Sequence, residues 1–470
     1  MKKDNDLQNM IYQMLLTQIE LGVYHYHDKL PFIKEMSQYL HVSVETVRAA
    51  YNKLKKEQYI TISKNVGSHV IVNYTQEEVD HHIQVFFAAR KDALLDLSQS
   101  MKYLFNHAQL MSLKKASPQL LDELELLIKN RNIKISYRAI QFFLELYQLL
   151  ESDVMVRLIW QIFLFFQIPF LDILKDIPLL EEKGLLLIET IHLSRQKQWD
   201  KLQSIIDQSY DWMYLSISEF YEHKIQIQLD QSHYFTWNIY KKNEQKCYSV
   251  GLELIQDIQK GYYLEGTYLP SLAELSKEKK VSLSTIRRTI TLLNKLGAVQ
   301  SINGVGTLIL SHSESSDHCD FTQHIIHHRL SDFVQSLYIC TLTCQNIIKV
   351  TFKHLPDEQM NQFVSLLVQL KKNNHCELSA YATIEYIMHY SPYQSIHTIY
   401  SHLFQQFLWG YPLHKSDNER LLSIKDTDEL LIYLNQQNFS QFAKKVENIL
   451  TDDLRAAYLD LKQLGIVLPI

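Results

Sequence analysis

LPFIKEMSQYLHVSVETVRAAYNKLKK (residues 30–56) and LPSLAELSKEKKVSLSTIRRTITLLNK (residues 269–295) are two copies of one segment, separated by a constant 239 positions. The same offset pairs Gly22 with Gly261 upstream and Gly67 with Gly306 downstream, so the repeat extends beyond the quoted stretches without a gap. Self-similarity at a fixed spacing indicates a duplicated structural unit. The chain therefore contains the same small domain twice.

Hydrophobic spacing within the first copy predicts a short helical domain. Ile11, Leu15 and Ile19 recur at helical spacing, and that run ends at Gly22, a typical C-terminal glycine. Apolar positions continue through two more helices and comprise Ile33, Met36, Leu40, Val47, Ala50, Tyr51 and Leu54. We expect these side chains to face one core.

Local signals set the boundaries of those helices. Pro31 suits the first turn of the second helix, where its missing N–H costs nothing, and Ser43 is a suitable N-cap for the third. Residues 59–63 and 69–72 are rich in β-forming side chains and flank a turn at 64–67, which predicts a hairpin. The predicted order is helix, helix, turn, helix, wing.

The second copy repeats each of these signals. Its markers are Val250, Leu254 and Ile258 on the first helix, the stop at Gly261, Pro270, the cap Ser282, and a wing SINGVGTLIL around Gly304 and Gly306. Helix, cap, recognition-helix and wing signals thus occur in the same order twice, which is far more specific than one helix-turn-helix match.

In these motifs the chain resembles the GntR family of bacterial transcription regulators. LPSLAELSKEKKVSLSTIRR and NGVGTLI resemble the family pattern LPS-x-R-x-LA-x-x-LGVSR-x-TVR followed by G-x-GTF, and LPFIKEM, HVSVETVRAAY and GSHVIV form a looser match. The resemblance covers about a third of the chain. It implies a mainly α fold with two winged helix-turn-helix domains, and double-stranded DNA as the partner.

A recognition helix enters the major groove with its N-terminal end, so first-turn and outward residues are the candidate DNA contacts. In the first copy these are Ser43, Val44, Glu45, Thr46 and Arg48, and further candidates are Lys34 on the second helix and Lys64, Asn65 and His69 at the wing. In the second copy they are Ser282, Leu283, Ser284, Thr285, Arg287 and Arg288, and further candidates are Ser271 at the second helix and Asn303 at the wing. The resemblance places Thr46 with Arg48, and Thr285 with Arg287, on DNA.

Both copies depart from the family pattern on the recognition surface. Val44 and Leu283 stand where the family has Arg, and the family's Arg on the second helix is Lys34 in one copy and Ala273 in the other. Val44 and Leu283 are therefore candidates for contact with thymine methyl groups, and Glu45 for a cytosine amino group. The alternative for all these positions is the solvated surface of a fold that has lost DNA binding. At the wings an exposed polar turn is an equal alternative.

Charge is concentrated in the two repeats. Net charge is −5, but residues 1–75 hold nine Lys and Arg against seven Asp and Glu, and residues 236–311 hold ten against six. The repeats thus carry +2 and +4, which leaves −11 for the remainder. Where positive charge lies matters more for nucleic-acid binding than the total.

Length and composition indicate a helical, multi-domain, cytoplasmic protein. The 470 residues exceed one ordinary core, and 11 Gly with 9 Pro leave few tight turns. Five cysteines without a CxxC pair favour reduced thiols, and the N-terminus shows no apolar targeting segment. Residues 158–171 are interrupted by Gln161, Gln167 and Pro169, which favours a buried helix over a membrane span.

Two helical segments of similar length follow the repeats. Residues 139–150 and 363–370 are amphipathic, and the breaks Gln196-Lys197-Gln198-Trp199 and Gln436-Gln437-Asn438-Phe439 lie at similar places. We therefore expect domains at 1–75, 76–235, 236–312 and 313–470, with the duplication covering each whole half. The layout resembles the all-helical effector domain of the FadR branch, which implies a small-molecule effector and a possible homodimer interface.

Candidate metal ligands were weighed in the second helical segment. His318, Cys319, His324, His327 and His328 cluster in a polar transition, where solvated or partly packed histidines are favoured over a metal site. Cys340 and Cys344 are expected as core thiols. The run Trp160, Phe163, Phe165, Phe166 and Phe170 is expected in the core or a subunit interface rather than a ligand pocket. We expect no metal and no cofactor.

The favoured hypothesis is a ligand-responsive repressor that reads an imperfect inverted repeat with two unequal recognition helices, as a monomer or a homodimer. The alternative is a helical scaffold or sensor whose DNA-reading domains have decayed. An enzyme is the least favoured class, because the sequence shows no alternation of strands and helices, no nucleophile motif and no phosphate loop.

Overall fold

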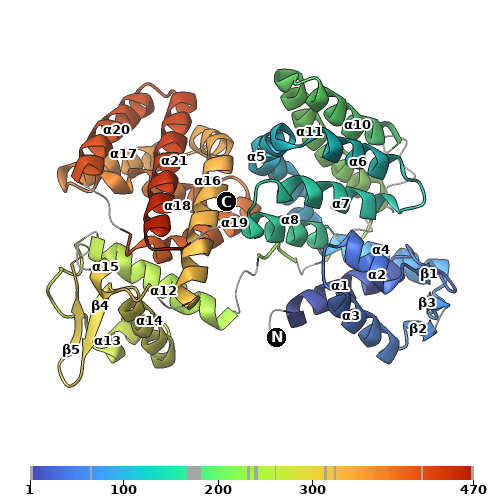
Figure 1. Ribbon diagram of the computed structural model, residues 1–470, viewed down its shortest axis with the longest axis horizontal. Helices are drawn as coiled ribbons and strands as arrows, with labels where there is room; N and C mark the ends of the chain where they lie inside the picture. The colour runs from blue at the N-terminus through green and yellow to red at the C-terminus, as the bar shows by residue number, and fades with distance from the viewer. Residues whose placement is uncertain are drawn as a thin grey trace. The chain divides into compact units, whose positions relative to one another are not determined.

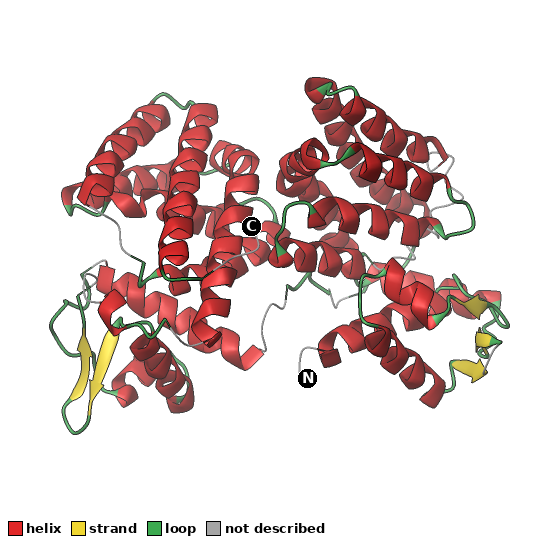
Figure 2. Ribbon diagram, in the orientation of Figure 1, coloured by secondary structure: helices red, strands yellow, loops and turns green. Residues whose placement is uncertain are grey.

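A computed structural model describes residues 4–63, 66–166, 181–229, 233–237, 242–259, 261–311, 315–321, 324–413 and 417–466. The chain divides into two compact units, Met1–Phe235 and Thr236–Ile470 (Figure 1). Helices dominate both units, and the described strands form two small antiparallel sheets, one in each unit (Figure 2). The predicted mainly α fold is confirmed. No described helix has the length and hydropathy needed to span a bilayer.

The N-terminal winged helix, our name for residues 4–70, contains the predicted elements. Its helices are α1 (Asp4–Glu20), α2 (Ile33–Tyr39) and α3 (Val44–Lys56), and its strands are β1 (Lys29–Leu30), β2 (Ile60–Ser63) and β3 (Gly67–Val70). The sheet order is β1-β3-β2. Val47, Ala50, Tyr51 and Leu54 are fully buried, which confirms the inward face predicted for α3.

The central winged helix, residues 242–310, repeats this structure. Its elements are α12 (Lys242–Gln259), α13 (Leu272–Glu278), α14 (Leu283–Lys295), β4 (Val299–Ile302) and β5 (Gly306–Ile309). The last four begin and end 239 residues after α2, α3, β2 and β3. Details of the backbone repeat as well: His41 and Lys280 both adopt left-handed φ values, 50° and 51°, and Gly22 and Gly261 have φ of 72° and 78°. The duplication seen in the sequence is therefore a duplication of structure.

The start of α2 differs from the sequence-based expectation. Pro31 lies before the helix, because Phe32 is the N-cap and its N–H donates to Glu35 Oε2 at 2.8 Å. The Pro31 carbonyl instead accepts a hydrogen bond from the Tyr51 hydroxyl at 2.8 Å. A third wing strand, β1, was also not predicted, and it pairs Lys29 with His69 and Leu30 with Ser68. Leu30 precedes a proline, a position biased towards extended backbone, so the signal was present.

A helical bundle follows each winged helix. The first comprises α4 (Gln76–Ala88), α5 (Lys91–Lys115), α6 (Pro118–Lys129), α7 (Ile135–Gln148), α8 (Asp153–Phe165), α10 (Glu181–Arg195) and α11 (Trp199–Lys224). The second comprises α15 (Ser315–His318), α16 (His324–Lys353), α17 (Asp357–Lys372), η4 (Cys376–Leu378), α18 (Ser379–Tyr390), α19 (Gln394–Gln406), η5 (Phe407–Gly410), α20 (Asp417–Asn435) and α21 (Phe439–Gln463). In the first bundle α5 packs along α11, and in the second α16 packs along α21.

The bundles repeat each other from α5 and α16 onwards. α6 contacts α10 as α17 contacts α20, and the last helices start at equivalent caps, Gln198 and Asn438, with nearly identical dihedral angles. Lys197 and Gln437, one residue earlier, both have left-handed φ. The exception is α4, because the equivalent stretch in the second unit contains the short α15 and the start of α16.

α4 completes a hydrophobic core in the first unit. Its Phe87 packs with Leu21 at the end of α1, with Leu94 of α5, and with Phe220 and Tyr221 of α11. The Phe87 and Phe220 ring centroids are 4.8 Å apart. α4 therefore joins the winged helix to the last helix of its bundle.

The two winged helices contact their bundles through different residues. In the first unit the Tyr137 hydroxyl of α7 donates to Gln18 Oε1 at 2.9 Å and lies 3.1 Å from the Tyr24 hydroxyl. In the second unit Arg329 of α16 donates to the Tyr248 hydroxyl at 2.7 Å, and Gln405 of α19 donates to Ser249 Oγ at 3.0 Å. The first contact is made near the C-terminal end of α1, and the second within the first half of α12.

Cys340 and Cys344 are fully buried on α16, as expected for core thiols. His318 is exposed, Cys319 is buried, and His327 Nε2 lies 2.6 Å from the Phe321 carbonyl oxygen. The side chain of His324 and residues 167–180, including Phe170, lie outside the described part of the structure. Of the aromatic run, Trp160 is buried on α8, and Phe163, Phe165 and Phe166 are half-buried.

Candidate nucleic-acid interface

The recognition helices α3 and α14 begin at serine caps. Ser43 Oγ accepts the N–H of Thr46 at 3.1 Å, and Ser282 Oγ accepts that of Thr285 at 3.2 Å. Both serines have extended backbone and lie exposed at the helix ends. Because peptide dipoles add along a helix, these exposed ends carry partial positive charge and suit a phosphate.

The tip of α3 carries its own counter-charge. Arg48 is exposed on the predicted face, but its guanidinium pairs with the carboxylate of Glu45, one turn earlier. Val44 is 36% exposed at the first helical position, and Lys34 is exposed on α2. Val44, Glu45 and Arg48 thus lie exposed at the start of α3, and the positive charge of Arg48 is already balanced by Glu45.

Thr46 is not a surface residue, contrary to the sequence-based expectation. It is 3% exposed, and its Oγ1 lies 2.7 Å from Ser43 Oγ. The hydroxyl is therefore part of the hydrogen-bonded start of the helix. The equivalent Thr285 is half-buried, with Oγ1 at 2.9 Å from Ser282 Oγ. The sequence pattern could not separate a threonine that caps from one that contacts DNA.

The tip of α14 is positively charged without compensation. Ser284 stands at the position of Glu45, so Arg287 has no acidic neighbour one turn earlier. Arg287 and Arg288 are both exposed, and neither makes an ion pair within the residues that the structure describes. Leu283 is 44% exposed beside them. The two recognition helices share a backbone and differ by two units of charge at their tips.

Predicted wing contacts are only partly described. Lys64 and Asn65 lie outside the described residues, and His69 is half-buried on β3, where it pairs with Lys29 and Thr61. Asn303 is exposed in the turn between β4 and β5. Val66 and Val305, at equivalent places of the two wings, are 57% and 64% exposed.

Ser271 acts as the N-cap of α13. Its N–H donates to Glu274 Oε2 at 2.8 Å, and its Oγ accepts the Glu274 N–H at 3.3 Å. The hydrogen bonds from the Ser271 hydroxyl and N–H lower the pKa of the Glu274 carboxyl. Ser271 is exposed but engaged in this capping box, so its primary role in the structure is to start α13.

Side chains next to the wings were missed by the sequence argument. Lys29 Nζ lies 3.9 Å from the centre of the Phe32 ring, and Gly67, with φ of 112°, sits against both. A Cβ at Gly67 would come within 2.8 Å of Lys29 Cε. In the second copy Gly306 sits against Tyr268 in the same way. Phe32 and Tyr268 are about half exposed, so each wing glycine rests on an accessible side chain from the segment before α2 or α13.

The comparisons with known proteins agree with this geometry. Residues 7–70 and 248–309 match the model of the bacterial regulatory proteins of the gntR family. Both winged helices are GntR-family domains. The matched residues end at the wings, so the family model covers the two GntR domains and neither bundle. No curated protein sequence matches the chain.

Solved structures similar to the chain include three bacterial proteins. Streptococcus agalactiae GntR is 17% identical with a TM-score of 0.22, and the match covers 45% of this chain and 99% of that one. Lar, described as controlling expression of the Listeria monocytogenes agr system and mediating virulence, is 18% identical with a TM-score of 0.22 over 47% and 99%. Escherichia coli McbR/YncC is 15% identical with a TM-score of 0.25 over 46% and 98%.

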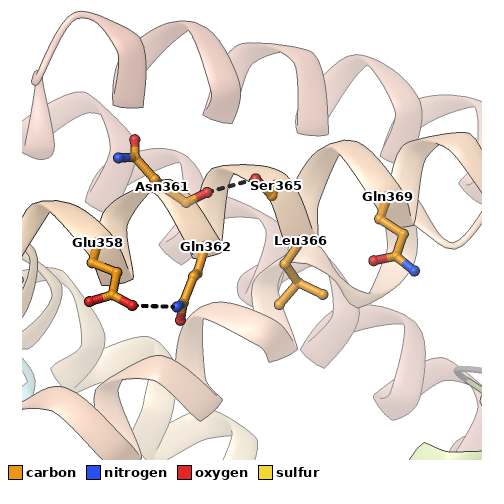
Figure 3. Close-up of a pocket in the computed structure, with 6 residues that line it drawn as sticks. All are labelled: Glu358, Asn361, Gln362, Ser365, Leu366 and Gln369. Carbon is orange, nitrogen blue, oxygen red and sulfur yellow. Dashed lines mark hydrogen bonds between the residues drawn. The ribbon is translucent and has the colours of Figure 1, made fainter.

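One surface recess lies outside the GntR domains, on α17 (Figure 3). It is lined by Glu358, Asn361, Gln362, Ser365, Leu366 and Gln369. Its polar groups bond along their own helix, with Gln362 Nε2 3.3 Å from Glu358 Oε1 and Ser365 Oγ 2.8 Å from the Asn361 carbonyl oxygen. All six residues belong to a single helix, so the recess has no opposing wall to hold a ligand.

Proposed function

We propose that the chain is a sequence-specific DNA-binding transcription regulator that reads two unequal half-sites. The observation that carries the proposal is the tip of α14, where Arg287 and Arg288 lie exposed beside the capped start of a GntR recognition helix. An exposed pair of guanidinium groups at a positive helix end fits phosphate oxygens or guanine edges. The tip of α3, with Glu45 paired to Arg48, would contact its half-site differently.

The proposal extends to the organisation of the chain. Domains at 1–75 and 236–312 would bind DNA, and those at 76–235 and 313–470 would respond to a small-molecule effector or mediate homodimer contacts. Because both recognition helices lie on one chain, a monomer would supply both half-site contacts of an imperfect inverted repeat. Binding there would repress transcription by occupying a promoter, and the site of action would be the bacterial cytoplasm.

The proposal is tested by selecting bound fragments from a genomic library with the purified chain, then footprinting the selected site. Replacing Arg287 with Ala should weaken binding by roughly 5- to 150-fold, the range of a base-contacting arginine. Lys295→Ala, at the far end of α14, is the matched control and should change affinity less than twofold. If selection enriches no sequence, or if both variants behave alike, the assignment of α14 fails.

A scaffold or sensor without DNA binding is the second candidate. The compensated tip of α3 and the buried Thr46 favour it, because both reduce what the first GntR domain offers to DNA. This candidate predicts no retardation of any duplex at moderate salt, whereas an active regulator binds even non-specific DNA in the micromolar range or weaker.

A further inference from the structure

The outer faces of α6 with α10 and of α17 with α20 are equivalent surfaces of the two bundles. The N-caps Ser117 and Pro356 align α6 with α17 at the repeat offset of 239, and residues 122–129 and 361–368 show the same sequence of buried, half-buried and exposed positions. The equivalent caps of α11 and α21 align the preceding helices, α10 and α20, at an offset of 240. The two surfaces can therefore be compared residue by residue.

In the first bundle this surface is an ion-pair network. Glu125 of α6 pairs with Lys129 on its own helix and with Arg195 of α10. Arg195 also pairs with Asp122, at 2.6 Å between Nη2 and Oδ1, and His192 Nε2 lies 3.8 Å from Glu125 Oε1. These five linked side chains are typical of a surface that remains in water.

The second bundle carries none of these charges. In the order Asp122, Glu125, Lys129, His192 and Arg195, the equivalent residues are Asn361, Val364, Val368, Ile432 and Asn435. Val368 and Ile432 are each 51% exposed, and Val364 is half-buried. Single exposed apolar residues are ordinary on protein surfaces, but a group of them at the place of an ion-pair network indicates a surface that a partner covers.

The charges at the ends of α17 indicate which partner fits. Asp357 and Lys372 lie on the same side of the helix as Val364 and Val368, because the spacings follow the helical repeat. Both charged residues are exposed, and neither makes an ion pair in the part of the chain that the structure describes. Val364 lies almost midway between them, so this side of α17 is negative at one end, positive at the other and apolar at the centre. Such a surface is complementary to an antiparallel copy of itself.

We propose that α17 and α20 of the second bundle form a homodimer interface, in which two copies of α17 pack antiparallel about a two-fold axis near Val364. Around this axis Val364, Val368 and Ile432 of one copy pack against the same residues of the other. The two-fold symmetry places Asp357 of each copy opposite Lys372 of the other, so each charge pair occurs twice.

The size of this surface indicates a weak dimer. α17 has 16 residues and is therefore about 24 Å long, and two helices from each copy form an interface at the lower end of the usual size range. The recess of Figure 3 shares Asn361 with this surface and follows the adjacent stripe of α17, so it borders the second copy. The proposal names the surface for the homodimer contacts included in the proposed function, and association is measured without DNA.

The test is sedimentation equilibrium of the full chain at about 1 to 100 µM, where the mass should rise from that of one chain towards that of two. The variant Val364→Glu/Val368→Lys/Ile432→His gives this surface the residues that the first bundle has at the same places. It should weaken association at least about tenfold, because unpaired charges become buried in the interface. Leu459→Lys changes a residue of α21 that is 60% exposed and should leave association within about twofold.

Charge reversal tests the antiparallel arrangement. Lys372→Glu and Asp357→Lys each bring like charges together at two symmetric places and should weaken association roughly 3- to 30-fold. The double variant Asp357→Lys/Lys372→Glu restores opposite charges and should associate more strongly than either single variant. Thermal unfolding of each variant checks that the fold persists, and Val368→Lys alone serves if the triple variant does not fold.

The proposal is overturned if the unchanged chain keeps the mass of one chain at about 100 µM. A triple variant that associates as strongly as the unchanged chain overturns it as well, and so does a double charge reversal that associates no more strongly than the single variants. Self-association of a chain that binds no DNA would reject the proposed function and leave this interface in place.

Discussion

Exchanging one residue between the two recognition helices tests whether the charge at each helix tip controls DNA affinity. Glu45→Ser gives the first tip the residue of the second, and Ser284→Glu gives the second tip the acid of the first, at the same helical position. In the first change Arg48 loses its partner and becomes available to phosphate. In the second, Arg287 acquires an acidic neighbour one turn earlier.

The magnitude follows from counterion release. Each phosphate neutralised contributes about 0.9 to the slope of log Kobs against log salt, so one added contact strengthens binding about eightfold at 0.1 M and about fourfold at 0.2 M. Glu45 also stabilises the positive end of α3, and its loss should lower stability by about 0.3–1 kcal/mol. Affinity and stability therefore change in opposite directions, which separates a direct effect on DNA from a damaged fold.

The assay is fluorescence anisotropy of a labelled random-sequence duplex, titrated with the full chain at several KCl concentrations. Glu45→Ser should steepen the salt slope by about 0.9, and Ser284→Glu should make it shallower by about the same amount. The double exchange should return the slope close to that of the unchanged chain. A random-sequence duplex is used because a sequence-specific contact between Glu45 and a base then does not contribute to the measured affinity.

A slope unchanged in both single variants would refute the reasoning, because the charges at these tips would then not face phosphate. Stronger binding by Ser284→Glu would refute it as directly. Weaker binding of a selected operator by Glu45→Ser, together with stronger binding of random DNA, would instead indicate that Glu45 accepts a hydrogen bond from a cytosine amino group.

Three further predictions concern stability and titration. Leu54→Ala and its counterpart Leu293→Ala each empty a fully buried site and should lower the unfolding free energy by about 2–5 kcal/mol in urea titrations; a loss below about 1 kcal/mol would show that the site is loosely packed. Thr46→Val keeps the shape but removes the hydroxyl that bonds to the capping Ser43, so stability should fall by about 0.5–1.5 kcal/mol while DNA affinity stays within twofold; a large loss of affinity at unchanged stability would restore Thr46 as a DNA contact. Hydrogen bonds from Lys129 and Arg195 hold the pKa of Glu125 at about 2, so their stabilising effect is complete above pH 4.5 and is lost as the pH falls through 2. Carbon-detected NMR should place its titration there and find it higher in Arg195→Ala, and an ordinary midpoint in the unchanged chain would contradict the ion-pair geometry.

Sequence signals within a few residues were sufficient to predict helix starts, the turns after the first helices and the inward positions of α3. Serine caps predicted the starts of α3 and α14, and left-handed glycines at 22 and 261 mark the turns after α1 and α12. Each of these signals occurs twice at the same offset, which strengthens the prediction of two similar domains. The inward positions of α3 followed from helical periodicity alone.

Features that depend on distant neighbours were not predicted. Pro31 lies outside α2 because Phe32 caps that helix and the Pro31 carbonyl is used by Tyr51, twenty residues later. Thr46 is buried, and its hydroxyl lies 2.7 Å from Ser43 Oγ, so its side chain is engaged within the protein rather than exposed on the surface. The pairing of Glu45 with Arg48 was open to prediction from their i, i+3 spacing, since helical side chains at that spacing are neighbours.

α4 gives the two halves of the chain unequal cores. In the first unit its Phe87 packs with Leu21, which follows α1, and with Phe220 of α11, so one apolar cluster spans the GntR domain and its bundle. In the second unit Asp453 and Asp460 stand at the places of Met213 and Phe220, so α21 carries carboxylates there instead. Substitutions at equivalent places of the two halves should therefore have unequal effects on stability.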